Sequence, residues 1–254
     1  MKDKKQIQGP NFMIVGAARS GTGTLCHYLD RHPGIYLSKP LKPEPTFFVY
    51  PEEYKKGIDY YLTARYGGED SQKARGEKST KYMTEKGVAK RIHTHFPDMK
   101  LIFLLRDPVE RAFSNYWWSV KNGVEDLSLE EAMFHEEQRI RKYKGKWRFV
   151  APHSYKRRGF YVQFIREYLR LFPKKSMLFL ITEEMIKNPP PVINETFDFL
   201  GVPRMKKFPR VRCNEALRHK RPSEELIRYL VDLYRHSNRE LEEFLGRKID
   251  CWLK

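Results

Sequence analysis

The sequence predicts an α/β protein: a single three-layer domain over residues 1–254, built on a mostly parallel central sheet. Short apolar runs alternate with longer amphipathic stretches, which is the pattern of strands alternating with helices. The length of 254 residues suits one large domain, and no repeat or low-complexity linker divides it. A glycine-rich turn follows the first apolar run, as in parallel sheets that bind phosphorylated ligands.

Three apolar runs predict buried strands at 12–15, 100–105 and 176–181. The first leads through a glycine-rich turn, 16–23, into a helix of about ten residues that ends before His32-Pro33-Gly34. Further helices are predicted at about 84–96, 108–121, 128–142, 159–172, 190–200 and 223–245. Ligands of such sheets bind at the carboxyl ends of the strands, so the residues directly after each strand are candidate site residues.

The composition is that of a globular protein, with 40% hydrophobic and 32% charged residues. The 49 Lys and Arg exceed the 32 Asp and Glu, which gives a formal net charge of +17. This surplus indicates an anionic partner: nucleic acid, acidic lipid, anionic glycan or phosphorylated cofactor. Cations cluster at 142–148, 156–158, 206–212 and 218–221, each of which could equally be a solvated basic surface. Tyr143 and Trp147 interleave the first cluster, which would also suit stacking on sugars or bases.

The hydropathy pattern and the cysteine content of the sequence predict a cytoplasmic location. No apolar run approaches the ~20 residues of a membrane span, and the charged start does not resemble a signal peptide. The three cysteines, Cys26, Cys213 and Cys251, are widely spaced without a CxxC pair, which argues against a zinc site or a disulfide framework. One Cys213–Cys251 bridge stays open. The sequence does not indicate an oligomeric state.

The turn after the first strand, 16–24, reads Gly-Ala-Ala-Arg-Ser-Gly-Thr-Gly-Thr. Gly16 and Gly21 match half of a P-loop, in which backbone N–H groups and a helix N-terminus bind phosphate oxygens. The match ends at Thr22 and Gly23, where nucleoside triphosphatases have Lys followed by a Mg²⁺-binding hydroxyl. Arg19 places a cation inside the turn instead, which suits a sulfonyl group better than a Mg²⁺-dependent phosphoryl group. An ordinary strand-to-helix turn is the alternative.

A second candidate site follows the strand at 100–105. Asp107 is a predicted N-cap, Pro108 suits the first helical position, and Glu110 would complete a capping box. Arg106 ends the strand and Ser114 lies about a turn and a half into the helix. Together they could hold a second phosphate. The alternative is a structural ion pair at Arg106 and simple packing of Ser114.

With the segments between them, these turns resemble the PAPS-dependent sulfotransferases, PAPS being 3′-phosphoadenosine 5′-phosphosulfate. The similarity is greatest to the heparan sulfate sulfotransferase branch and its bacterial relatives. Residues 12–24 resemble the 5′-phosphosulfate loop, 44–48 the Glu-Pro-His-Phe-Phe element, 77–82 the Glu-Lys-Ser/Thr-Pro-x-Tyr stretch, and 101–118 the 3′-phosphate site. The tail also follows the bacterial members, so the resemblance covers essentially the whole chain.

The resemblance implies in-line transfer of the sulfonyl group from PAPS to a hydroxyl of a carbohydrate or other small acceptor, without a metal. Glu44 would be the general base, Arg19 an electrostatic stabiliser of the leaving oxygen, and Lys78 a neighbour of the sulfonyl group or acceptor. The other implied cofactor ligands are Ser20, Gly21, Thr22, Gly23, Thr24, Arg106, Ser114, Tyr161, Lys220 and Arg221. Thr46 in place of His and Thr80 in place of Pro depart from the family pattern.

Several alternatives stay open. The acceptor could be a lipid or a polyketide-type intermediate, and the chain could be a Golgi lumenal domain without its anchor. A kinase-like enzyme is disfavoured by Thr22 and Gly23. A basic nucleic-acid-binding protein without enzymatic activity would leave the ordered motifs unexplained, so no nucleic acid is expected as partner. The adjacent Glu183 and Glu184 are interpreted as a solvated strand end, and His93 and His95 diverge on a helix.

Overall fold

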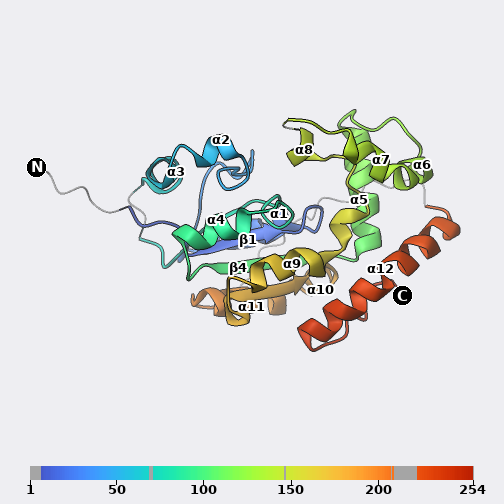
Figure 1. The fold of residues 1–254 in the computed structure, drawn as a ribbon. Coiled ribbons are helices and arrows are strands. Elements are labelled where there is room, and N and C mark those ends of the chain that lie inside the picture. Colours follow the sequence, from blue (N-terminus) through green and yellow to red (C-terminus); the bar gives the residue numbers. More distant parts are fainter. Residues whose placement is uncertain (1–6, 69–70, 146, 207, 209–221, 254) are drawn as a thin grey trace, which may run out of the picture.

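A five-stranded sheet forms the centre of the protein. The computed structural model describes residues 7–68, 71–145, 147–206, 208 and 222–253. The strands are β1 (Phe12–Gly16), β2 (Ile35–Leu37), β3 (Ala74–Lys78), β4 (Lys100–Leu105) and β5 (Met177–Ile181), in the order β2-β3-β1-β4-β5. Each neighbouring pair is parallel (Figure 1), so the predicted α/β class is confirmed.

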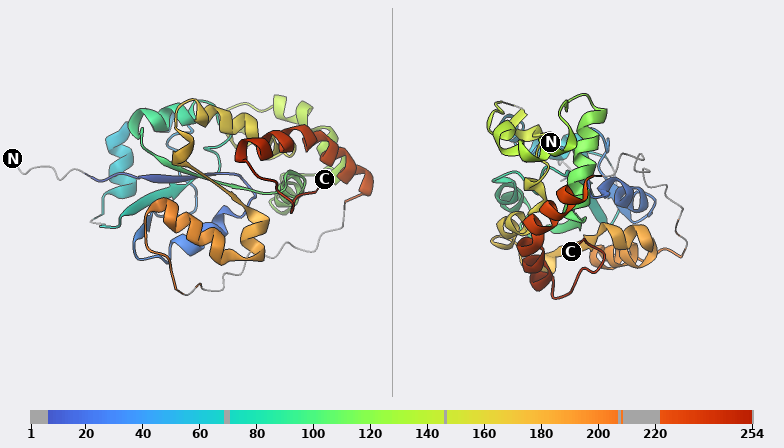
Figure 2. Two further views of the ribbon diagram at one scale, coloured as in Figure 1. Left: turned by 90° about the horizontal axis from the view of Figure 1, so that it is seen from below. Right: turned by 90° about the vertical axis from the view of Figure 1, so that its right-hand side faces the viewer.

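Helices cover both faces of this sheet and extend beyond its carboxyl edge (Figure 2). They are α1 (Thr22–Leu29), α2 (Pro51–Tyr54), α3 (Ile58–Tyr66), α4 (Val88–His95), α5 (Pro108–Lys121), α6 (Leu129–Phe134), α7 (Glu136–Arg141), α8 (Trp147–Val150), α9 (Tyr161–Leu169), α10 (Thr182–Lys187), α11 (Pro189–Leu200) and α12 (Glu224–Leu245), with 3-10 turns at Arg157–Gly159 and Lys174–Ser176. None of the described helices is long and apolar enough to cross a membrane.

Successive residues of β1 enter opposite cores, as the two-residue period of a strand requires. Met13 and Val15 join the core under α4 and α9, whereas Phe12 and Ile14 join the core under α1, α10 and α11. A third core, formed largely by α5, α6 and α12, includes Phe113 and Leu230. The helix that carries Ser114 is therefore fixed by packing and not only by its connection to β4.

Two strands and several helix boundaries differ from the prediction. The strand β3 was missed because its buried residues include the charged Arg75, Glu77 and Lys78, which no apolar pattern can reveal. The β2 strand has only three residues. The helix predicted at 128–142 is two helices that meet at His135, and α4 begins only after Gly87, which has a left-handed φ of 80°.

Buried polar contacts compensate the charges of β3. Glu77 is completely buried, and its carboxylate accepts hydrogen bonds from the hydroxyls of Tyr82 at 2.7 Å and Tyr66 at 3.5 Å. Burial raises the pKa of Glu77, despite these hydrogen bonds. The Arg75 guanidinium stacks over the rings of Tyr36 and Tyr66. This strand therefore brings Lys78 to the carboxyl edge of the sheet.

Candidate active site

The glycine-rich turn after β1 is shaped to bind an anion. Arg19 and Gly21 both have left-handed backbone conformations, with φ angles of 68° and 78°. They turn the chain into α1, whose first N–H groups, at 22–24, have no acceptor within their own helix. No acidic residue lies in the first turn of α1. The Ser20 hydroxyl is completely buried and lacks a hydrogen-bond partner among the described residues. This combination fits a phosphate or sulfate group.

The two predicted phosphate sites face each other. The Nε and Nη2 atoms of Arg19 donate to the Ser114 hydroxyl at 3.3 and 3.1 Å. Nη1 of Arg106 donates to the Arg19 carbonyl at 3.3 Å. The strands β1 and β4 are direct neighbours in the sheet, so the turn after one and the helix after the other meet at the same edge. One ligand with two anionic groups could contact both.

Positive charge accumulates between these turns. Burial, and then the charges of Arg106 and Arg111, lower the pKa of Arg19, although an arginine remains charged at neutral pH. Arg106 has a counter-charge in Glu110, whose carboxylate lies 3.2 Å from Nη2. A bound anion would offset the repulsion among these guanidinium groups. The site therefore fits the phosphate and sulfate groups that the sequence resemblance implies.

The start of α5 has the predicted N-cap but not the predicted capping box. The Asp107 carboxylate accepts from the backbone nitrogens of Val109 at 2.8 Å and Glu110 at 2.9 Å, which confirms the N-cap. The predicted capping box is wrong, because the side chain of Glu110 pairs with Arg106. The backbone N–H of Asp107 donates instead to Glu183, at 3.1 Å.

The prediction of a solvated strand end at Glu183 is also wrong. Its second carboxylate oxygen accepts from the Trp252 indole at 3.1 Å, and burial raises the pKa of this carboxyl group. Glu184 diverges from it and pairs with Arg247 at 2.6 Å. The position of Glu183 after β5 was the only sequence signal available, because its partners lie far away along the chain.

Two buried hydroxyls support the turns from beneath. The Thr182 hydroxyl lies 2.7 Å from the carbonyl of Ser20 and 2.8 Å from that of Leu105, which ties both turns to β5. The Tyr161 hydroxyl donates to the Arg106 carbonyl at 2.7 Å, and its side chain is 1% exposed. Tyr161 was expected to contact a cofactor, and the structure places it under the backbone of the second site. Thr182 was not anticipated from the sequence.

Glu44 and Lys78 form an ion pair at the same edge of the sheet. Lys78 Nζ lies 2.6 Å from Glu44 Oε1. The other carboxylate oxygen accepts from the backbone nitrogen of Thr80 at 2.7 Å and from its hydroxyl at 2.8 Å. The Glu44 side chain keeps 25% of its surface exposed, compared with 6% for Lys78. Lys78 ends the strand beside β1, so the carboxylate is held near the glycine-rich turn with one side open.

Lys220 and Arg221 lie outside the described residues, as does Cys213. Cys26 is buried and Cys251 is exposed. Within the ranges that the structure describes, no three His, Cys, Asp or Glu side chains gather into a group that could hold a metal ion.

The fold and the site define an α/β protein with a cation-lined anion site at the carboxyl edge of a parallel sheet. The sulfotransferase domain family matches residues 9–229. The chain therefore belongs to the sulfotransferase family.

Individual relatives agree with this assignment. The chain is 29% identical to human heparan sulfate glucosamine 3-O-sulfotransferase 6, over 94% of this chain and 72% of that protein. It is 27% identical to mouse heparan sulfate glucosamine 3-O-sulfotransferase 3A1, over 96% of this chain and 65% of that protein. The crystal structure of a sulfotransferase from Alicyclobacillus acidocaldarius superimposes with a TM-score of 0.81 at 30% identity, covering 97% of this chain and 99% of that one.

Proposed function

We propose that this protein transfers the sulfonyl group of PAPS to a hydroxyl of a carbohydrate or other small acceptor and releases 3′-phosphoadenosine 5′-phosphate (PAP). The meeting of Arg19, Ser114 and Arg106 between the two turns carries this proposal. A doubly phosphorylated adenosine would have one anionic end in each turn. The names of the heparan sulfate relatives and the net charge of +17 support a carbohydrate acceptor.

PAPS, when bound, supplies the sulfonyl group and the leaving phosphate. The backbone N–H groups at 22–24 and the Arg19 guanidinium would stabilise the charge that grows on the leaving oxygen. Arg19 has this electrostatic role only, because arginine does not deprotonate in proteins. Arg106 and the hydroxyl of Ser114 would hold the 3′-phosphate, which a charged fork and a neutral donor suit.

Glu44 would take the proton of the acceptor hydroxyl as sulfur is attacked from the side opposite the leaving oxygen. Its carboxylate is fixed by Lys78 and Thr80 yet open on one side, as a general base needs. Lys78, which pairs with Glu44, would orient this carboxylate and place a cation near the acceptor hydroxyl. Activity without a metal and a cytoplasmic location stay predictions from the sequence.

The deciding experiment combines ligand binding with transfer. Melting temperature is compared with PAP, ATP, ADP and NAD, because a ligand that binds only the native state raises it. We expect PAP to give the largest rise without Mg²⁺, and ³⁵S from labelled PAPS to reach an oligosaccharide acceptor. A rise with Mg²⁺-ATP and none with PAP would contradict the proposal and favour a kinase-like enzyme.

A further inference from the structure

A hollow is lined by residues from the part of the chain that connects α5 to α9, outside the residues given roles above. It has a volume of about 520 Å³ and is open to solvent. Its lining combines aromatic and basic side chains: Lys142, Tyr143, Lys144, Trp147 and His153. Both lysines are exposed, and Trp147 retains 54% of its surface exposed. The hollow therefore exposes an indole face and two ammonium groups to the same volume of solvent.

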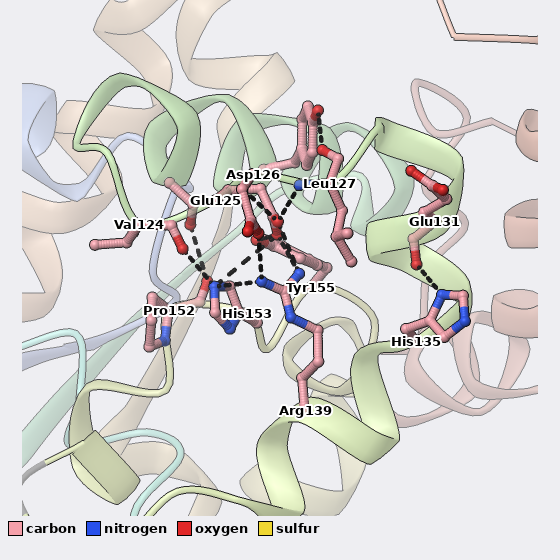
Figure 3. A network of polar contacts seen from close by, with 12 residues as sticks. Val124, Glu125, Asp126, Leu127, Glu131, His135, Arg139, Pro152, His153 and Tyr155 are labelled. Carbon is pink, nitrogen blue, oxygen red and sulfur yellow. Dashed lines mark hydrogen bonds and ion pairs between the residues drawn. The ribbon is translucent and has the colours of Figure 1, made fainter.

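The aromatic wall of the hollow is held in place by hydrogen bonds. His153 Nε2 lies 2.6 Å from the carbonyl oxygen of Val124 and 3.1 Å from Arg139 Nη2 (Figure 3). The other ring nitrogen, Nδ1, is hydrogen-bonded to the Tyr143 hydroxyl. The two rings are stacked, with an interplanar angle of 24°. The wall therefore presents a preformed flat face.

Behind this wall lies a buried carboxylate that neutralises Arg139. The Glu125 side chain is completely buried, and each of its two oxygens accepts a hydrogen bond from Arg139 Nη1 at 2.7 Å (Figure 3). The Tyr155 hydroxyl also donates to it. Burial opposes ionisation of Glu125, but these hydrogen bonds outweigh that effect and lower its pKa. The charge of Arg139 is thus compensated, and Lys142 and Lys144 supply the positive charge of the hollow.

Short contacts connect the hollow to both sides of the candidate active site. Asn115, which follows Ser114 in α5, donates to the carbonyl of Pro152 in the hollow at 2.8 Å. On the other side, Phe149 of α8 packs edge-on against Tyr50, with ring centroids 5.0 Å apart. Tyr50 directly precedes α2, and Figure 1 shows α8 opposite α2. This contact places α8, which begins at Trp147, beside the segment that follows Glu44.

We propose that this hollow is a second acceptor subsite, which binds an anionic sugar unit other than the one that receives the sulfonyl group. The inference rests on the proposed function. The faces of Trp147 and Tyr143 suit the apolar face of a sugar ring. Lys142 and Lys144 suit a carboxylate or sulfate substituent on it. The concave volume is sized for a ring, whereas nucleic acid binding generally tracks a backbone along an extended groove.

The test measures binding of a heparan sulfate octasaccharide to the PAP-saturated full chain by calorimetry. Variants are W147A and the double variant K142Q/K144Q. The matched control is K187Q/K248Q, which removes two exposed lysines elsewhere. We expect each hollow variant to raise the dissociation constant roughly tenfold, the loss that suits two exposed charge contacts or one stacked ring. The control variant, the melting temperature and PAP affinity should be unchanged, and a neutral glucan octasaccharide should bind weakly to every variant.

Three results would overturn the subsite. Both hollow variants could bind the octasaccharide as the wild type does, or the wild type could bind PAP but no octasaccharide. A short DNA duplex could also compete as well as the octasaccharide does and lose affinity equally in the variants, which would indicate a nucleic-acid surface. Failure of the proposed function is distinguishable, because the wild type would then not bind PAP at all.

Discussion

Thr80 donates two hydrogen bonds to one oxygen of Glu44, from its backbone nitrogen at 2.7 Å and its hydroxyl at 2.8 Å. The motif that this segment resembles has proline there, and proline has neither donor. The departure from the family pattern therefore adds contacts to the carboxylate that we propose as general base. Lys78 holds the opposite oxygen, so the carboxylate is fixed from two sides.

We expect Thr80→Val to lower kcat roughly tenfold, because a lost hydrogen bond to a charged group costs about 1.5–3 kcal/mol. Affinity for PAP should not change. The measurement is steady-state sulfonyl transfer, with Thr63→Val, on the exposed side of α3, as the matched control. A wild-type kcat in Thr80→Val would show that the hydroxyl does not position Glu44.

Glu44→Gln should lower kcat by about 10²–10⁴-fold, the usual contribution of a positioned general base. The amide keeps the size of the side chain but cannot accept the proton. PAP binding, measured by calorimetry, should stay within about twofold, since Glu44 lies outside both anion turns. Near-normal turnover with intact PAP binding would remove Glu44 from the role of base.

Arg106→Ala should weaken binding of PAP by roughly 10–100-fold, the loss of one charged hydrogen-bonding group. Binding of adenosine 5′-phosphate, which has no 3′-phosphate, should change much less. Calorimetry with both nucleotides separates these effects. Glu110→Gln is the control, because it removes the partner of Arg106 but leaves the cation in place. Equal losses for the two nucleotides would place Arg106 away from the 3′-phosphate.

Glu125→Gln should destabilise the protein by about 3 kcal/mol at pH 7, since it leaves Arg139 with only the exposed Asp126 as a counter-charge. The pKa of Glu125 is lowered in the folded state, so its contribution exists above the unfolded pKa of about 4.3 and is lost as pH falls through the folded value. Urea unfolding at pH 7 and at lower pH measures this.

The difference between wild type and Glu125→Gln should therefore shrink on acidification. Glu137→Gln, an exposed residue of α7, should have little effect at either pH. A difference that grows as the pH falls would contradict the lowered pKa of Glu125.

The sequence predicted the parts of the fold that depend on local patterns. The apolar runs of β1, β4 and β5 and the Asp107 N-cap are confirmed, since each is determined by neighbouring residues. The strand β3 was missed because its buried charges are compensated by tyrosines and an arginine outside the strand. No periodicity in one sequence reveals partners that meet only in the folded state.

The same reason explains what was missing from the candidate site. Arg19, Ser114, Arg106 and Glu44 were predicted from motif order, and the structure places the first three together. Glu183 and Thr182 support those turns through hydrogen bonds to residues that lie 76 to 162 positions away in the sequence. A short motif cannot encode partners at that separation. Residues that position a site are therefore harder to find than residues that line it.

The backbone nitrogen of Leu253 donates to Asp107 at 2.6 Å across 146 positions of sequence, beside the indole that Glu183 holds. During translation, the start of α5 therefore leaves the ribosome long before the segment that fastens it. A nascent chain halted before Trp252 would have every phosphate ligand proposed here, but it would lack the hydrogen bonds from Trp252 to Glu183 and from Leu253 to Asp107. Nucleotide affinity should then appear late in synthesis, and a chain shortened by proteolysis at this end should lose it early.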